Sequence, residues 1–184
     1  MVADLSRDLV WIECDFHERD HCLNTIIDQF SDSNASVILV GSQKEGIESI
    51  THDRLVEHLG RSVEYAIYNA FDGFTPNALA QLSGMVQAPG LLFLVSPKRE
   101  VWPVFADPNL QALGQFDGEK SRYISLLISN LIDIHRVDSV NEEWLAHRQL
   151  SSSNGHYALT RDQILCLSTL DHQWRLDGSV TVLT

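Results

Sequence analysis

The stretch Leu91-Leu92-Phe93-Leu94-Val95 decides the fold, because a short, wholly apolar run is typical of a parallel strand that is buried on both faces. Val37-Ile38-Leu39-Val40 has the same character. Residues 9–14 form another predicted strand, and residues 63–68 alternate in polarity as a strand does. These four segments predict the framework of one sheet.

Helical patterns fill the intervals between the predicted strands. Residues 18–30 have apolar side chains at helical spacing, and residues 51–59 form a short predicted helix closed by Gly60. Thr75-Pro76 supplies an N-cap and a proline for a helix that Pro89-Gly90 is predicted to stop. Strands that alternate with helices predict a parallel sheet covered on both faces. The expected fold class is therefore α/β, a Rossmann-like three-layer sandwich with a mostly parallel sheet.

The pattern changes after this fourth strand. Residues 96–118 contain prolines and glycines among the aromatic residues Trp102, Phe105 and Phe116, which we expect to be exposed on a long ordered loop or partner surface. Helical spacing returns over residues 119–134, and residues 151–155 have the composition of a linker. We expect one α/β domain over residues 1–150 and a C-terminal helix-strand extension over residues 151–184.

Composition limits the possible functions. No apolar run in the 184 residues approaches the roughly 20 that a membrane helix needs, so we expect a cytoplasmic protein with no membrane partner. The formal net charge of −12 disfavours tight binding of nucleic acid unless cations cluster locally. The basic residues to test for RNA contact are Lys98, Arg99, Arg122, Arg136 and Arg148, and the alternative is that they are ordinary solvated surface charges.

Cys14, His17, His21 and Cys22 combine the thiol and imidazole groups that zinc prefers. Their spacing matches no standard structural zinc pattern, and the two histidines share a helix face only if the helix begins before His17. Core cysteines beside solvated histidines are the favoured interpretation. We therefore predict no metal site.

Residues 41–46 follow a predicted strand and contain two glycines, as a phosphate loop does. However, Ile47 and Glu48 stand where that loop needs Lys and Ser or Thr, and a glutamate would repel phosphate. We interpret the segment as an ordinary strand-to-helix loop. Because the chain also has no nucleophile elbow and no evident Ser, His and Asp set, we predict no catalytic residue.

Gln163 is the one predicted cofactor-binding residue. Residues 159–163 precede a helical pattern and then the strand-like residues 179–184, an order typical of the entrance to a nucleotide site before its phosphate loop. A Gln amide there can donate to and accept from the adenine edge of ATP. Thr160 and Gln163 also have the spacing of a capping box. Both roles can hold together, and the strand after the helix favours the adenine role.

Two runs of sequence resemble the N-terminal domain of bacterial tRNA(Met) cytidine acetyltransferases. They are residues 63–74, Val-Glu-Tyr-Ala-Ile-Tyr-Asn-Ala-Phe-Asp-Gly-Phe, and residues 79–86, Leu-Ala-Gln-Leu-Ser-Gly-Met-Val, followed by the apolar strand 91–95 and Ser96-Pro97. The Gly-Phe and Leu-Ser-Gly elements are the most specific part. The similarity in layout covers essentially the whole chain, with a looser match before Gly60.

This resemblance implies an activity that belongs to a larger protein. Members of the family use acetyl-CoA to acetylate N4 of the wobble cytidine in elongator tRNA(Met), and a helicase-like module couples the reaction to ATP hydrolysis. By resemblance, Gln163 occupies the position that contacts adenine, and residues 151–184 are a linker with the first helix and strand of the ATPase module. The phosphate-binding lysine, the magnesium ligand and the acetyl-CoA loop would follow Thr184.

The resemblance also sets the expected partners. They are the ATPase and acetyltransferase domains of the parent chain, and tRNA(Met) through the parent protein. ATP and acetyl-CoA would serve the parent enzyme, and we expect neither to be bound by this chain alone. The expected role is a non-catalytic scaffold or a wall of the tRNA channel, with the Trp102 to Phe116 loop and the Trp144 region packed on the ATPase module. The alternative is a freestanding α/β interaction module whose C-terminal helix and strand complete its own fold.

Overall fold

The computed structural model describes residues 7–30, 34–112, 120–131 and 135–137, and these build a six-stranded sheet in the order β3-β2-β4-β5-β1-β6. Every neighbouring pair of strands is parallel. The strands are β1 (Arg7–Cys14), β2 (Val37–Val40), β3 (Glu48–Ile50), β4 (Val63–Asn69), β5 (Val86–Pro97) and β6 (His135–Val137). The predicted parallel sheet is confirmed.

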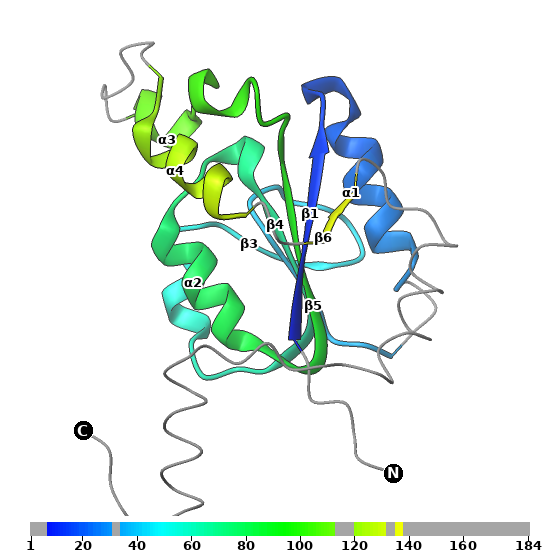
Figure 1. Cartoon of the computed structure of the whole chain (residues 1–184). Coiled ribbons are helices and arrows are strands. Elements are labelled where there is room, and N and C mark those ends of the chain that lie inside the picture. The colour runs from blue at the N-terminus through cyan, green and yellow to red at the C-terminus, as the bar shows by residue number, and fades with distance from the viewer. Residues whose placement is uncertain (1–6, 31–33, 113–119, 132–134, 138–184) are drawn as a thin grey trace, which may run out of the picture. The chain divides into compact units, whose positions relative to one another are not determined.

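Helices cover both faces of this sheet (Figure 1). α1 (Arg19–Asp28) lies on one side, and α2 (Pro76–Met85), α3 (Pro108–Ala112) and α4 (Arg122–Asn130) lie on the other. Short 3₁₀ helices complete the connections: η1 (Phe16–Glu18), η2 (Leu55–His58), η3 (Ala70–Asp72) and η4 (Trp102–Val104). The arrangement is the predicted α/β three-layer sandwich.

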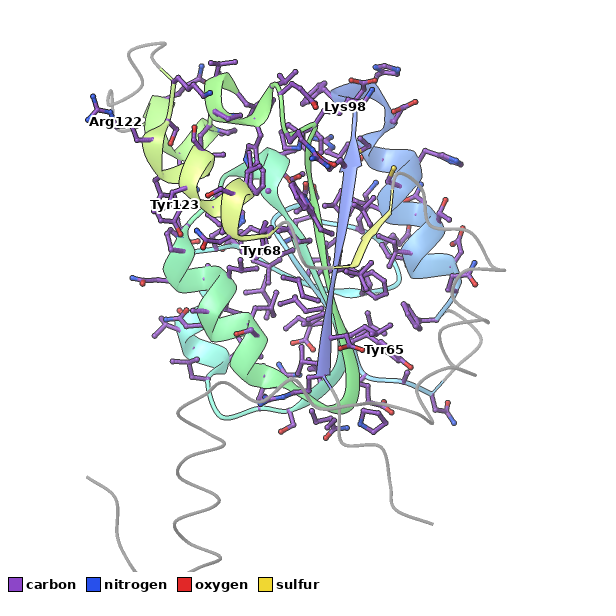
Figure 2. The ribbon with its side chains drawn as sticks, in the orientation of Figure 1. Tyr65, Tyr68, Lys98, Arg122 and Tyr123 are labelled. Atoms are coloured by element: carbon purple, nitrogen blue, oxygen red, sulfur yellow. The ribbon has the colours of Figure 1, made fainter. Side chains whose placement is uncertain are left out.

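The central strands alternate their side chains between two hydrophobic cores, as the period of a strand requires. In β1, Trp11 enters the core under α2 and α4, whereas Ile12 enters the core under α1. Tyr68 and Tyr65 of β4 likewise belong to opposite cores, and Figure 2 shows them on opposite sides of the sheet. The apolar pattern of the central strands is therefore explained by burial on both faces.

The predicted stop of α2 at Pro89-Gly90 is wrong. The helix ends at Met85, and β5 starts at Val86 and runs through both residues. An added side chain on Gly90 would place its Cβ 2.4 Å from the carbonyl oxygen of Glu64, at the register shift between β4 and β5. Gly90 thus permits a close approach of two strands, which is the other common reason for glycine in a strand.

The predicted helix over residues 51–59 is also wrong. The chain forms β3 just before this segment, then a turn and the short η2. Consequently residues 41–46 join one strand to another, and they are not the strand-to-helix loop that we expected. β3 has only three residues, so its period could not be read from the sequence.

The loop after β5 is better buried than predicted. Trp102 is 3% exposed and packs edge to face on Phe74 with ring centroids 5.4 Å apart, and Phe105 is only partly exposed. α4 confirms the helical pattern after residue 119, and β6 follows it without having been predicted. Phe116 and the predicted linker at residues 151–155 lie outside the described residues. No helix in the described part of the chain is long and apolar enough to cross a membrane.

Candidate functional site

The carboxyl edge of the sheet is the place where open α/β folds bind ligands. β1 and β5 lie side by side, but the chain leaves β1 for α1 on one face and leaves β5 for α4 on the other (Figure 1). Such a divergence opens a crevice between the two strand ends in this class of fold. The residues at these ends are therefore the first candidates for a site.

A buried ion pair lies at the carboxyl ends of β1 and β5. The Glu13 side chain is 3% exposed and accepts a hydrogen bond of 2.8 Å from the backbone N–H of Arg99. The Arg99 guanidinium donates to the same carboxylate at 3.3 and 3.4 Å and lies over the Trp11 ring. Trp11 Nε1 in turn donates to Ser96 Oγ at 2.8 Å. The polar groups at these two strand ends thus satisfy one another.

A second ion pair joins the residues just after the same two strand ends. Lys98 Nζ lies 2.5 Å from Asp15 Oδ2, and Figure 2 shows Lys98 at this end of the sheet. The hydrogen bond from Lys98 lowers the pKa of Asp15 below its ordinary value. Because both residues are well exposed, this pair contributes little to stability.

A third group of side chains joins the loops after β2 and β4. Asn69 is fully buried and donates hydrogen bonds of 2.7 Å to Ser42 Oγ and to Asp72 Oδ2. Ser42 also donates to Asp72, and Arg19 Nη1 reaches the other Asp72 oxygen at 3.2 Å. Lys44 pairs with Asp20 at 3.0 Å and is the main reason that the pKa of Asp20 is lowered. These contacts tie three connections together at the carboxyl edge.

His52 lies beside this group and has an unusual environment. Its ring centroid is 5.1 Å from that of Tyr68, and its Nε2 has no hydrogen-bond partner although the atom is buried. Burial lowers the pKa of His52, against the opposing effect of Asp72 and Asp107. The imidazole is therefore held in its neutral form.

The Cys14, His17, His21 and Cys22 set does not converge on one point. Among the described residues, the group with metal-like ligand spacing is Asp15, His17 and Glu18. A helix start accounts for its carboxylates, because Glu18 accepts from the Asp15 N–H at 3.2 Å and Asp15 binds Lys98. This group is therefore explained without a metal ion.

The basic residues named above for a test of RNA contact do not form one cluster among the described residues. Lys98 and Arg99 are engaged in the ion pairs above, and Arg122 lies on α4, well apart from Lys98 in Figure 2. Arg136 is in β6, while Arg148 and the predicted adenine ligand Gln163 lie outside the described residues. The residues that the structure does assemble, Glu13, Asn69 and Asp72, were not predicted. The sequence contained a signal for these residues, because polar residues lie at the ends of two predicted strands, where ligand-binding residues of this fold class are found.

Two surface pockets lie away from this edge. One of about 180 Å³ is bordered by Phe30 and Gly46, and one of about 310 Å³ is bordered by Arg7 and Val86 at the amino ends of β1 and β5. Neither of these two pockets coincides with the chemical groups of the carboxyl edge. The side chains described above at that edge hold loops to one another.

Residues 1–139 match the family described as "tRNA(Met) cytidine acetyltransferase TmcA, N-terminal". The chain belongs to the TmcA N-terminal family. A curated relative, tRNA(Met) cytidine acetyltransferase TmcA of Nitrosococcus halophilus (strain Nc4), is 35% identical over 51 residues. This alignment covers 28% of the chain and 7% of the relative, so the chain spans only a small part of that protein's length. The TmcA N-terminal family resemblance drawn from residues 63–97 is confirmed.

The buried Glu13–Arg99 pair is expected to stabilise the fold more than a surface pair does. Glu13→Gln should lower the free energy of unfolding by about 1–3 kcal/mol, because it removes the charge partner of a partly buried guanidinium. Glu57→Gln is the matched control, since Glu57 pairs with Arg54 on the surface, and its cost should be below about 0.5 kcal/mol. Urea unfolding measures both, and equal losses would contradict a structural role for the Glu13–Arg99 pair.

His52 is expected to make stability fall on mild acidification. Its pKa is lowered in the folded state, so the unfolded chain takes up the proton first as the pH falls below about 6.5. The stability contributed by the neutral imidazole is present above that pH and is lost as the pH falls through the folded pKa. Urea unfolding at pH 7.5 and 5.5 should show a smaller drop for His52→Asn than for the unsubstituted chain. The exposed His21→Asn is the matched control, and a drop reduced equally in both variants would contradict the role of His52.

Proposed function

We propose that this chain is the non-catalytic N-terminal scaffold of an ATP-dependent RNA acetyltransferase. The reaction of the whole enzyme would form N4-acetylcytidine at the wobble position of elongator tRNA(Met) from acetyl-CoA. Membership of the TmcA N-terminal family, over residues 1–139, is the observation that carries this proposal. The ATPase and acetyltransferase domains, and tRNA(Met) bound by the whole protein, are the proposed partners.

The carboxyl edge supports a scaffold role. Glu13 is buried against Arg99, and Asn69 and Ser42 are both bound to Asp72, so the groups best placed to meet a ligand are used within the domain. An enzyme site normally keeps hydrogen-bonding groups available for its substrate and its transition state. Hydrogen-bonding groups that instead connect loops to one another make the surface rigid, so that another domain can be positioned on it.

Exposed apolar side chains supply a possible contact surface for the ATPase module. Val101 and Val104 flank the buried Trp102, and they are 49% and 48% exposed. On α4, Tyr123 and Leu126 are 46% and 62% exposed, and Ser121 at the start of this helix donates to the Pro103 carbonyl at 2.6 Å. We assign these side chains to the docking role that we expected of the loop aromatics, because Trp102 and Phe105 pack into the domain instead.

The catalytic activity should depend on the rest of the parent protein. Expressed in a bacterial strain that lacks N4-acetylcytidine, this chain alone is expected to restore no modification, whereas the full-length protein should restore it. Mass spectrometry of nucleosides from purified tRNA(Met) measures the outcome. Acetylcytidine formed by this chain alone would overturn the scaffold role. A native gene with no Gly-x-x-x-x-Gly-Lys-Ser/Thr loop downstream would favour the freestanding interaction module.

Gln163 is expected to contact adenine in the full-length protein. Gln163→Ala should raise the KM for ATP roughly ten-fold, since a two-point amide contact with adenine contributes about 1–3 kcal/mol. Thr160→Ala is the matched control, because it removes the other half of the capping box and should leave the KM for ATP unchanged. ATP binding by the present chain should be undetectable by calorimetry. An unchanged KM for ATP in Gln163→Ala would contradict the adenine contact and leave helix capping as the only role of Gln163.

A further inference from the structure

Two neighbouring helices, η4 and α4, present apolar side chains to solvent. Side chains three residues apart in a 3₁₀ helix eclipse one another, so Val101 and Val104 lie on one side of η4 and leave the buried Trp102 on another. Tyr123 and Leu126 are also three residues apart and share one face of α4. These four exposed side chains, Val101, Val104, Tyr123 and Leu126, are called the α4–η4 surface below.

The two halves of the α4–η4 surface are fixed to each other. The backbone N–H of Ser121, at the start of α4, donates to the Pro103 carbonyl of η4 at 2.6 Å. The Tyr123 ring stacks on Phe74 with centroids 6.2 Å apart, and Phe74 packs edge to face on Trp102 at 5.4 Å. The inner face of α4 packs on the core through Ile124, Leu127 and Ile128. The surface is therefore formed before any partner arrives.

Two cations border this surface, and neither makes an ion pair within the described part of the chain. Lys120 and Arg122 are both exposed. Arg122 is one helical turn from Leu126, and Figure 2 shows it on the side of α4 away from the sheet. The N-terminus of α4 adds partial positive charge. By contrast, ion pairs hold six other cations of the described residues: Arg19, Lys44, Arg54, Arg61, Lys98 and Arg99.

The combination of apolar and basic groups indicates the chemistry of a partner. Exposed apolar side chains that lie together mark protein contacts, and charges at the rim of an interface select a partner of opposite sign. Glu100 is exposed beside Val101, so the positive charge belongs to the α4 half of the surface. An RNA phosphate could use the two cations but would leave the apolar side chains in water. A protein segment that carries both apolar and acidic side chains fits better.

The remainder of the parent polypeptide is the best source of such a segment. The 51 aligned residues are 28% of this chain and 7% of the curated relative, so that relative is about four times as long as this chain. A domain of the same polypeptide is present at a high effective concentration, and a modest surface is then enough to hold it. A second copy of this chain would bring the same net charge of −12, which opposes self-association.

We propose that the α4–η4 surface binds an acidic, amphipathic segment of the ATPase module of the parent protein. The apolar side chains of the surface are buried in the contact, and Lys120 and Arg122 pair with carboxylates of the segment and fix its orientation. This inference rests on the proposed function and adds the chemistry of the partner segment to it.

Carbodiimide coupling of the full-length protein tests the contact, because this reagent joins a lysine amine to a carboxylate that touches it. The chain contains three lysines. Lys44 with Asp20 and Lys98 with Asp15 are ion pairs within the domain, so their couplings are internal controls. Mass spectrometry of the digested protein should find Lys120 joined to an Asp or Glu beyond residue 184.

Three results of this mapping would overturn the proposal. They are a Lys120 coupling only to carboxylates of residues 1–184, a coupling between two copies in a mixture of light and heavy isotope-labelled protein, and no Lys120 coupling while the control couplings form. Protection of the Lys120 amine by tRNA(Met), in a protein without a Lys120 coupling, would assign the surface to RNA and would also overturn it.

Variants of the full-length protein test both halves of the surface. Arg122→Glu should lower the yield of the Lys120 coupling at least about five-fold relative to the control couplings, because a carboxylate there repels an acidic partner. Leu126→Asp should lower it similarly. Val56→Asp is the matched control, since Val56 is 55% exposed in η2, outside the α4–η4 surface, and the yield should not change. Equal losses in Leu126→Asp and Val56→Asp would contradict the assignment.

Analysis of acetylcytidine in the same samples separates this inference from the proposed function. A full-length protein that forms acetylcytidine without a Lys120 coupling overturns the surface assignment alone. A protein that couples Lys120 beyond residue 184 but forms no acetylcytidine supports the contact and contradicts the proposed function. Thermal unfolding of residues 1–184 with each substitution checks that the variant is folded.

Discussion

The pairing of β1 with β5 is the constraint on which the rest of the structure depends. Their register runs without interruption from Arg7 opposite Gly90 to Cys14 opposite Pro97. A parallel pair cannot be closed by a tight turn, so the chain between these strands must cross the sheet and build β2, β3 and β4 beyond β5. β6 pairs with the other side of β1, so β1 is an interior strand that supplies side chains to both cores. Because all pairs are parallel, the carboxyl ends of the strands meet at one edge.

Buried strands could be predicted from the sequence because their signal is local. The apolar runs in β2 and β5, and the pattern of β1 and β4, gave the sheet its correct central members. The wrong predictions concern residues whose environment is set by a residue far away in the sequence. The sequence predicts a helix stop at Gly90, but the glycine is needed because the carbonyl oxygen of Glu64, on another strand, leaves no room for a side chain there. Trp102 was expected on the surface, but Trp11 and Phe74, both remote in sequence, enclose it.

The candidate site was less predictable than the fold for the same reason. Glu13 and Arg99 are 86 residues apart, and Asn69 and Ser42 are 27 apart. Nothing in the local pattern of either segment indicates its partner. The Cys14, His17, His21 and Cys22 set is the exception in sequence distance, since all four residues flank one short connection.

The pairing of charges also bears on how RNA would meet this domain. For a phosphate to use Arg99, it must displace Glu13, whose 3% exposed carboxylate would then remain buried without its partner. Such a loss costs several kcal/mol, which exceeds what one phosphate contact returns in salt. Separating Lys98 from the exposed Asp15 costs less free energy than separating Arg99 from Glu13. A phosphate bound there would still lie beside acidic groups in a chain of net charge −12. The described cations at the β1–β5 edge, Lys98 and Arg99, are thus each paired with a carboxylate, which disfavours a phosphate contact at either of them.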